Sequence, residues 1–322
     1  MSIGTNIKKR RYELHMTQQE LANALGYKTR STIAKIESGE NDITQKKLRL
    51  FAEVLDTTAE ALLSELPKPN SDINALPKPS HPYNSYGQYS NRTVAIVLAG
   101  GKSIRNHQNV PNQFINVLGK PVIVYCLEAY QSHPAIDDIY IVCLKGWEKI
   151  VVAYAEQYHI TKLRGLIPAA TSGILSVKNG LEYVKNEYSD NDIIIFQEST
   201  RPMVSVDMIS KLLQFCFENG SANICQSMKD YVQFFYSDGK AKYIDRNSIV
   251  DLQSPEAYQF KIIKDVFETA RKQHHSLTES CCVMLMYNLG YDINFVEGHI
   301  NNIKIVRQED IAIFKSLVKN LY

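Results

Sequence analysis

A proline-rich stretch at residues 67–91 is the feature that most constrains how this chain can fold. Its sequence, PKPNSDINALPKPSHPYNSYGQYSN, is dominated by Pro, Ser, Asn and Gly, and Leu-Pro-Lys-Pro occurs twice, at residues 66–69 and 76–79. No apolar period of a helix or strand continues through this stretch, so it predicts an extended, semi-stiff linker. We therefore expect two domains, residues 1–66 and 92–322, that move independently.

The overall composition is typical of a soluble globular protein. The chain has 322 residues, 44% of them hydrophobic and 22% charged, with a formal net charge of +2. No window approaches about 18 uninterrupted apolar residues, and no apolar segment of a signal peptide follows the basic start, so we expect no membrane partner. The six cysteines form no CxxC pair and several lie in apolar runs, which predicts reduced core thiols in a cytoplasmic protein.

Residues 1–66 have the apolar spacing of an all-helical domain. Ile, Leu and Phe recur at helical intervals, and we expect a core that contains Ile7, Leu21, Ile33, Ile36 and Leu50. Thr17 and Glu20 form a capping box at the start of one helix, and Gly26 follows that helix, where a positive φ is needed. Asp56 is expected to cap the start of a last short helix, as Thr17 does for the earlier one. A tight turn joins the helix after Thr17 to a second helix at about residues 30–38, which predicts a helix-turn-helix.

The stretch TQQELANALGYKTRSTIAKIESGE resembles the Cro/repressor-type (XRE) helix-turn-helix family, and the resemblance covers residues 3–63. It implies a double-stranded DNA operator as partner, with the second helix in the major groove. Residue types that contact base edges lie near the start of that helix: Lys28, Thr29, Arg30, Ser31, Thr32 and Lys35. Gln18 and the basic run at residues 8–11 can contact phosphates. Because such units usually bind DNA as two-fold dimers, a homodimer is expected. The alternative to DNA binding is a protein-interaction domain.

Residues 92–322 alternate strand-like and helix-like patterns, which predicts a doubly wound α/β domain. Near-continuous apolar runs suit parallel strands, and we expect strands at residues 93–98, 139–144, 192–196, 222–226, 283–287 and 293–297. Helical patterns lie between them, at residues 122–132, 146–158, 174–187, 206–218, 261–273 and 308–321. A Ser-Asp-Gly turn at residues 237–239 predicts a small β-arm. Its aromatic residues fit a dimer interface or burial on the domain's own sheet equally well.

An ordered set of motifs runs through this domain. Ala99-Gly-Gly-Lys-Ser-Ile-Arg105 follows the first expected strand, as a phosphate-binding Gly-rich loop would. The other motifs come in this order: Pro111-Asn-Gln-Phe114, Ser176-Val-Lys-Asn-Gly-Leu181, Glu198-Ser-Thr-Arg-Pro202, Asp245-Arg246, Gln253-Ser-Pro255, Thr278-Glu279 and Asn302-Ile-Lys304. Their order and spacing resemble the cytidylyltransferases that make CDP-methylerythritol and CDP-ribitol, and the Ala-Gly-Gly loop is more similar to the ribitol branch.

This resemblance implies a Rossmann-like nucleotidyltransferase fold and a ligand such as CTP, a CDP-alditol or a sugar phosphate, with Mg²⁺ where a nucleotide binds. Catalysis would depend on Arg105 and Lys304, since phosphoryl chemistry of this kind relies on positioning and positive charge. The family pattern also implies ligand contacts for Ala99, Gly100, Gly101, Lys102, Ser103, Ser176, Arg201, Thr278 and Glu279. It implies a metal contact for Glu198.

The chain departs from the family pattern at several of these positions. Asn112 replaces the catalytic lysine, Gly173 replaces an arginine, and Ser103 replaces a loop glycine. Glu198 and Glu279 each replace an aspartate, so both side chains are longer by a methylene. Loss of one positioned cation at a transferring phosphoryl group reduces the rate by about 10³-fold. Together these changes predict that efficient turnover is lost.

Three hypotheses follow from this combination. The first is a transcriptional regulator whose degenerate cytidylyltransferase-like domain dimerises and senses a nucleotide or sugar phosphate. The second is an active cytidylyltransferase with a regulatory DNA-binding domain, in which Lys102 compensates for the missing lysine; otherwise Lys102 is an exposed loop charge. The third is a ligand-free dimerisation platform. Asn112 is the residue that discriminates between the first two.

Overall fold

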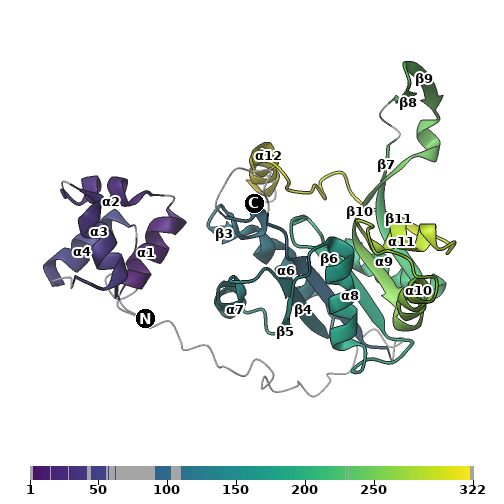
Figure 1. Cartoon of the computed structure of the whole chain (residues 1–322), viewed down its shortest axis with the longest axis horizontal. Helices are drawn as coiled ribbons and strands as arrows, with labels where there is room; N and C mark the ends of the chain where they lie inside the picture. The colour runs from purple at the N-terminus through teal and green to yellow at the C-terminus, as the bar shows by residue number, and fades with distance from the viewer. Residues whose placement is uncertain are drawn as a thin grey trace. The chain divides into compact units, whose positions relative to one another are not determined.

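The computed structural model describes residues 3–14, 16–27, 29–41, 45–55, 57, 62, 91–102, 110–228, 230 and 232–319. The chain divides into two compact units, residues 1–71 and 72–322 (Figure 1). The predicted linker, up to residue 90, lies outside the described residues, and so does the predicted helix that opens at Asp56 apart from residues 57 and 62. No helix in the described part of the chain is long and apolar enough to cross a membrane.

The N-terminal unit packs its helices around one apolar core. Its described helices are α1 (Ile3–Glu13), α2 (Gln18–Ala24), α3 (Arg30–Ser38) and α4 (Gln45–Val54). The predicted core residues Ile7, Leu21, Ile33 and Ile36 are buried in it. The capping box is confirmed, because the Glu20 amide donates to Thr17 Oγ1 at 3.1 Å and the Thr17 amide donates to Glu20 Oε2 at 2.6 Å. Gly26 has the expected positive φ, +76°.

The prediction that Leu50 belongs to this core is wrong, because its side chain is 48% exposed. The buried residues of α4 and the turn after it are Leu48, Phe51, Ala52 and Leu55. These positions have the i, i+3, i+4, i+7 spacing of a single helix face. Leu50 is two residues from Leu48 and therefore points away from that face.

The second unit is built on a seven-stranded sheet with the order β11-β7-β10-β6-β1-β4-β5. The strands are β1 (Thr93–Ala99), β4 (Asp138–Cys143), β5 (Leu163–Pro168), β6 (Ile193–Glu198), β7 (Ser221–Ser227), β10 (Val250–Gln259) and β11 (Phe295–Glu297). All pairings are parallel except those of β10, which runs antiparallel to both β6 and β7. The sheet is thus parallel apart from one internal strand.

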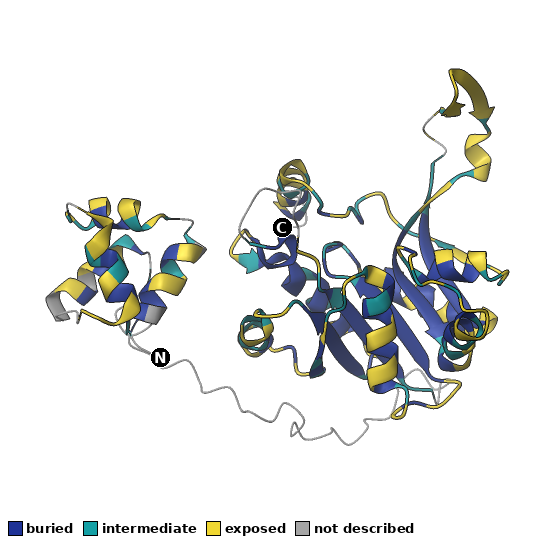
Figure 2. Cartoon of the chain, viewed as in Figure 1, coloured by how far each residue is buried: buried dark blue, intermediate teal, exposed yellow. Residues whose placement is uncertain are grey.

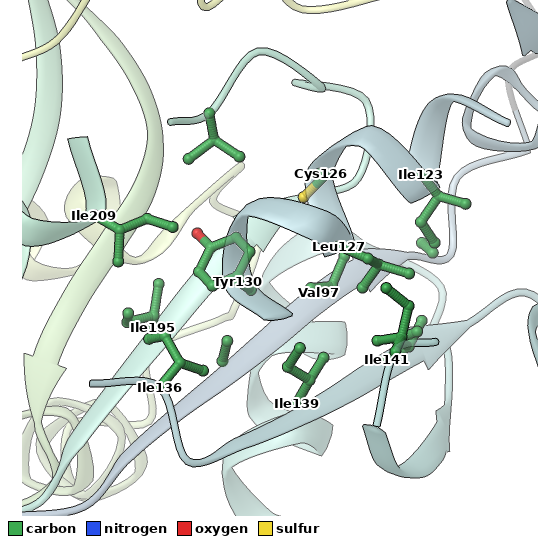
Figure 3. Packing of buried hydrophobic residues seen from close by; sticks show 14 of the residues in the cluster. Val97, Ile123, Cys126, Leu127, Tyr130, Ile136, Ile139, Ile141, Ile195 and Ile209 are labelled. Atoms are coloured by element: carbon green, nitrogen blue, oxygen red, sulfur yellow. The ribbon is translucent and has the colours of Figure 1, made fainter. Parts of the chain in front are cut away.

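Helices cover both faces of this sheet, as a doubly wound fold requires. One face packs against α6 (Val122–Ser132), α7 (Glu148–Gln157) and α9 (Val206–Asn219). The other face packs against α8 (Gly173–Val184), α10 (Phe260–Lys272) and α11 (Cys282–Asn288). Figure 3 shows Ile123, Leu127 and Tyr130 of α6 beside Val97 and Ile141 of the sheet. Alternate residues of β1 point to opposite faces of the sheet and belong to the two cores on those faces.

Three sheet predictions need correction. Residues 283–287 were expected as a strand but lie in α11, where Met284 and Tyr287 are exposed and Leu285 and Met286 are buried. That is helical spacing, and a short apolar run cannot be assigned to helix or strand by periodicity alone. Strands β5 and β10 were not expected. Pro255 interrupts β10 at a register shift, where a proline is tolerated.

The remaining elements lie at the edges of this domain. A short pair, β2 (Asn116–Val117) and β3 (Lys120–Pro121), packs with α12 (Gln308–Lys319), and the 3-10 turns η3 (Asn112–Phe114) and η4 (Arg246–Ser248) lie in loops. The predicted β-arm is the hairpin of β8 (Gln233–Ser237) and β9 (Lys240–Ile244). Its residues are largely exposed, so burial on the domain's own sheet is excluded for this arm (Figures 1 and 2).

Candidate functional sites

The candidate ligand site lies at the carboxyl ends of β1 and β6, which are neighbours in the sheet. Leu98 pairs with Glu198 in the β1–β6 register. The Gly-rich loop after Ala99 and the last residue of β6 therefore lie at the same edge of the sheet. In open α/β sheets, ligands bind in the crevice outside the carboxyl ends of the strands. The fold therefore brings two of the predicted motifs to the expected place.

A second contact brings Ser176 to the Gly-rich loop. A Cβ atom at Gly100 would lie 2.5 Å from the Cβ of Ala169 and 3.9 Å from Ser176 Oγ, so only glycine fits at this position. Ser176, near the start of α8, is buried, and its Oγ accepts a hydrogen bond of 3.0 Å from the Ala170 amide. The structure thus brings Gly100 and Ser176, both expected to contact a ligand, close together.

Gln113 holds the loop from the other side, a role that the motif alone did not reveal. Its Nε2 donates to the carbonyl oxygens of Ala99 and Gly101, both at 2.9 Å, and the residue is buried. Lys102 is exposed and makes no hydrogen bond or ion pair with the described residues. Ser103 and Arg105, to which ligand-binding and catalytic roles were assigned, lie outside the described residues.

Asn112, which replaces the expected lysine, is 3% exposed. Its Nδ2 donates to the carbonyl oxygens of Ile305 and Val306, both at 3.1 Å. A neutral amide therefore stands where the family pattern places a cation, and it is engaged with the backbone of the segment that follows Lys304. This side chain braces the site and presents no positive charge to a phosphate.

Glu198 joins two cations of the motif set, Arg201 and Lys304. Its Oε2 accepts a hydrogen bond of 3.0 Å from Arg201 Nε, and its Oε1 forms an ion pair with Lys304 Nζ. The other nitrogens of Arg201 donate to the carbonyl oxygens of Asn302, at 2.8 Å, and Leu252, at 3.3 Å. Arg201 is therefore occupied by the chain itself, whereas the side chain of Lys304 is 41% exposed.

The predicted residues Thr278 and Glu279 belong to a separate cluster around α11. Glu279 is buried, and its Oε1 accepts hydrogen bonds from His275 Nε2 and, at 3.0 Å, from Asn288 Nδ2. Burial raises the pKa of Glu279, but these hydrogen bonds outweigh it and hold the pKa below its usual value. Thr278 is exposed. Gly173 borders the same segment, since a Cβ there would lie 3.0 Å from the Ser280 carbonyl oxygen.

Glu256 of β10 is a buried carboxyl group that the sequence did not single out. The hydroxyl of Tyr258 lies 3.0 Å from its Oε2. Burial raises the pKa of Glu256 to about 7, the hydrogen bond from Tyr258 opposes this increase, and the charge of nearby Glu198 adds to it. The protonation of buried Glu256 therefore depends in part on the charge of Glu198.

The described residues do not form a metal site of their own. They include no group of three or more His, Cys, Asp or Glu side chains placed to hold a metal ion. A Mg²⁺ ion carried by nucleotide phosphates needs only one or two protein carboxylates. Glu198 is the residue to which that role was assigned, and both of its oxygens are already bonded to Lys304 and Arg201. A metal ion there would share these oxygens with Lys304 and Arg201.

The candidate nucleic-acid interface is the exposed start of α3. Arg30, Ser31 and Lys35 are exposed, and Thr32 is half-buried. Thr29 precedes the helix in extended conformation, and its exposed side chain does not cap it. The Arg30 amide is held instead by Gln19 Oε1 at 3.2 Å. Lys28, which was also assigned to DNA, lies outside the described residues.

Two residues that were predicted to contact phosphates form hydrogen bonds with Glu37 inside the unit. Arg11 is 3% exposed, and its Nη2 donates to Glu37 Oε2 at 2.9 Å. Gln18 Nε2 donates to the same oxygen at 2.8 Å. The signal was in the sequence, because Arg11 lies four residues after the core residue Ile7 on one helix face. Lys8 and Lys9 are exposed, as expected for phosphate contacts.

A Gly-rich loop, a carboxylate and a lysine around the edge of a doubly wound sheet define a nucleotidyltransferase-like domain, here in a chain that also has a helix-turn-helix unit. Residues 93–320 match the family of 2-C-methyl-D-erythritol 4-phosphate cytidylyltransferase, and residues 7–62 match a helix-turn-helix family. The first match spans more than half of the chain. The chain therefore belongs to this cytidylyltransferase family.

Individual relatives agree with this assignment. The ribitol-5-phosphate cytidylyltransferase of Lacticaseibacillus paracasei is 31% identical over 230 residues, which cover 70% of this chain and 97% of the relative. The 2-C-methyl-D-erythritol 4-phosphate cytidylyltransferase of Clostridium botulinum is 27% identical, covering 71% and 99% of the two chains. The 4-diphosphocytidyl-2C-methyl-D-erythritol synthase of Anaerococcus prevotii has the same fold, with a TM-score of 0.62 and 22% identity over 71% of this chain and 96% of that one.

Proposed function

We propose that this protein is a sequence-specific DNA-binding transcriptional regulator. Its cytidylyltransferase-like domain would dimerise and sense a nucleotide or sugar-phosphate ligand rather than turn it over. The observation that carries the proposal is Asn112, whose buried amide is bonded to the Ile305 and Val306 carbonyl oxygens where a phosphate-facing cation is needed. The pairing of Lys304 with Glu198 supports it, because Lys304 is the residue assigned to catalysis that the structure describes, and Glu198 neutralises its charge.

The DNA-binding half of the proposal rests on the exposed start of α3. Arg30, Ser31 and Lys35 can donate hydrogen bonds to base edges or phosphates from the N-terminal turns of a recognition helix. A single helix-turn-helix unit binds one half-site, and dimers bind two half-sites spaced by whole turns of the duplex. A homodimer is therefore part of the proposal.

The hairpin β8–β9 is the surface that we propose for dimerisation. Phe234, Phe235, Tyr236 and Tyr243 are each more than half exposed, and Val232, just before β8, is 66% exposed. Large apolar side chains that are exposed together on a two-stranded arm mark an interaction site. Burial of this arm against a second copy would remove the aromatic side chains from water, as aromatic-rich interface cores do.

An active cytidylyltransferase with a regulatory DNA-binding domain is the second candidate. The observation that favours it is the similarity to ribitol-5-phosphate cytidylyltransferase, at 31% identity over 97% of that enzyme. Lys102 also fits this candidate, since it is exposed in the loop and makes no ion pair with the described residues. In that case Lys102 would supply the charge that Asn112 lacks.

Two assays on the full chain test these candidates: the first separates them, and the second tests the DNA-binding role that they share. The first measures pyrophosphate release from CTP and Mg²⁺ with ribitol 5-phosphate or methylerythritol 4-phosphate, for the native protein and for Asn112→Lys. We expect the native protein to be at least about 10³-fold slower than a typical enzyme, for which kcat is about 10 s⁻¹. Turnover at the ordinary rate would overturn the sensor proposal. Activity gained by Asn112→Lys would identify the missing lysine as the cause of the loss.

The second assay selects binding sites from a random pool of double-stranded DNA. A regulator should enrich a recurrent sequence with two half-sites about 34–36 Å apart, or a multiple of that distance. Arg30→Ala should weaken or relax the enriched sequence, whereas Lys272→Ala, which removes an exposed cation from α10, should not. Failure of the native protein to enrich any sequence would argue against the DNA-binding role.

A further inference from the structure

The Glu198–Arg201–Lys304 cluster has one fixed side and one side that can open. Arg201 is 9% exposed and is held by Glu198 and by the carbonyl oxygens of Asn302 and Leu252. The backbone of Glu198 is also held in place, since its amide donates a hydrogen bond of 3.1 Å to Ser254 Oγ. Lys304 is different, because its side chain is 41% exposed and Glu198 Oε1 is the partner that the structure gives its Nζ.

The length of Glu198 suits it for this double contact. One carboxylate oxygen bonds Arg201 while the other reaches Lys304, which lies after β11 and 106 residues from Glu198 along the chain. The carboxylate therefore occupies Lys304 in the way that an anionic ligand would. A long, flexible lysine side chain can exchange one anionic partner for another at little cost, because a partly exposed ion pair is weak.

We propose that Glu198 is an internal competitor for the ligand. In the free protein its carboxylate holds Lys304, and a phosphate group of the ligand takes Lys304 only by displacing it. A polyphosphate or phosphate ester, which carries more than one negative charge, makes this exchange favourable, whereas a singly charged carboxylate does not. Glu198 would thus select multiply charged phosphate ligands. This inference rests on the proposed ligand-binding role of the domain.

The test is a calorimetric titration of the full chain with inorganic tripolyphosphate in metal-free buffer. Glu198→Gln keeps the shape of the side chain and can still accept a hydrogen bond from Arg201, but it no longer neutralises Lys304. We expect it to bind tripolyphosphate about fivefold more tightly than the native protein, or more. The gain should vanish when Lys304→Met is added, because the competitor then has nothing to release.

A matched control separates competition from a general change in charge. Glu268→Gln also removes one carboxylate, from an exposed pair with Arg271 on α10, and should leave the affinity unchanged. A native protein that binds tripolyphosphate, with a Glu198→Gln variant that binds no more tightly, would overturn the competitor role alone. The competitor role would also be overturned if Glu198→Gln still increased the affinity for tripolyphosphate in the Lys304→Met background. Absence of binding of tripolyphosphate and of CTP to every variant would overturn the ligand-binding proposal as well.

Discussion

Side chains at the candidate ligand site mainly hold backbone segments. The amide of Asn112 and two nitrogens of Arg201 donate to backbone carbonyl oxygens, and Gln113 does the same for the Gly-rich loop. These residue types suit phosphate recognition, but a donor that already bonds a buried carbonyl group is not free for a ligand. Their positions in the fold therefore reduce the charge that the described site can offer.

Glu256 gives a prediction for the pH dependence of stability. Its pKa is raised from 4.5 to about 7 in the folded protein, so folded Glu256 keeps a proton that the unfolded chain loses. Stability from this group is complete below pH 4.5 and falls as the pH rises to about 7, by up to roughly 3 kcal/mol. Glu256→Gln should remove this loss, so its stability relative to the native protein should be greater at pH 8 than at pH 4.5.

Urea unfolding of the full chain at several pH values measures this difference. Glu182→Gln removes an exposed carboxylate paired with Lys185 and serves as the control. It should not change how the unfolding free energy depends on pH to a comparable extent. An equal difference between native and Glu256→Gln at every pH would show that the pKa of Glu256 does not change on folding and would contradict the prediction.

Among the elements, α1 and α3 are tied by a buried ion pair. Arg11 of α1 and Glu37 of α3 are both nearly inaccessible to solvent, and Gln18 of α2 joins them. Removal of one partner leaves a buried charge, which typically destabilises a protein by about 3–5 kcal/mol. Arg11→Met should therefore unfold the N-terminal unit at much lower urea concentration.

The exposed residue Lys35 provides the matched control for this prediction. Lys35→Met should change the unfolding free energy by no more than about 0.5 kcal/mol. Replacement of both Arg11 and Glu37 by apolar residues of similar volume should recover most of the lost stability, since such pairs are often replaced at little cost. If Arg11→Met unfolds like the native unit, the pair is not a stabilising tie.

Elements with long, periodic patterns were predicted correctly, whereas some of the short or interrupted ones were missed or misassigned. The helix-turn-helix, β1 and α9 follow from capping residues, a continuous apolar run and a sustained helical period. Residues 283–287 are too few to show their period, so the burial of Leu285 and the exposure of Tyr287 emerge only when α11 packs on the domain. Pro255 concealed β10 because proline interrupts strand patterns.

For the whole molecule, dimerisation is the property on which the proposed regulation depends. We expect Phe235→Ser with Tyr236→Ser to raise the dimer dissociation constant by at least about tenfold, because buried aromatic side chains dominate interface energies. Analytical ultracentrifugation of the full chain measures this change. Tyr287→Ser, which removes an aromatic residue that is 70% exposed on α11, should have no such effect. A dimer unaffected by the hairpin changes would place the interface elsewhere.

The sequence by itself determined the two kinds of domain, their family resemblances and the loss of the lysine at Asn112, because periodicity, capping and ordered motifs are local in the chain. The tertiary structure decided what the polar residues do. Arg11 became a buried ion-pair partner, Asn112 a brace and Glu198 the partner of Lys304, 106 residues away. Such roles depend on contacts between distant segments, which a local pattern does not contain.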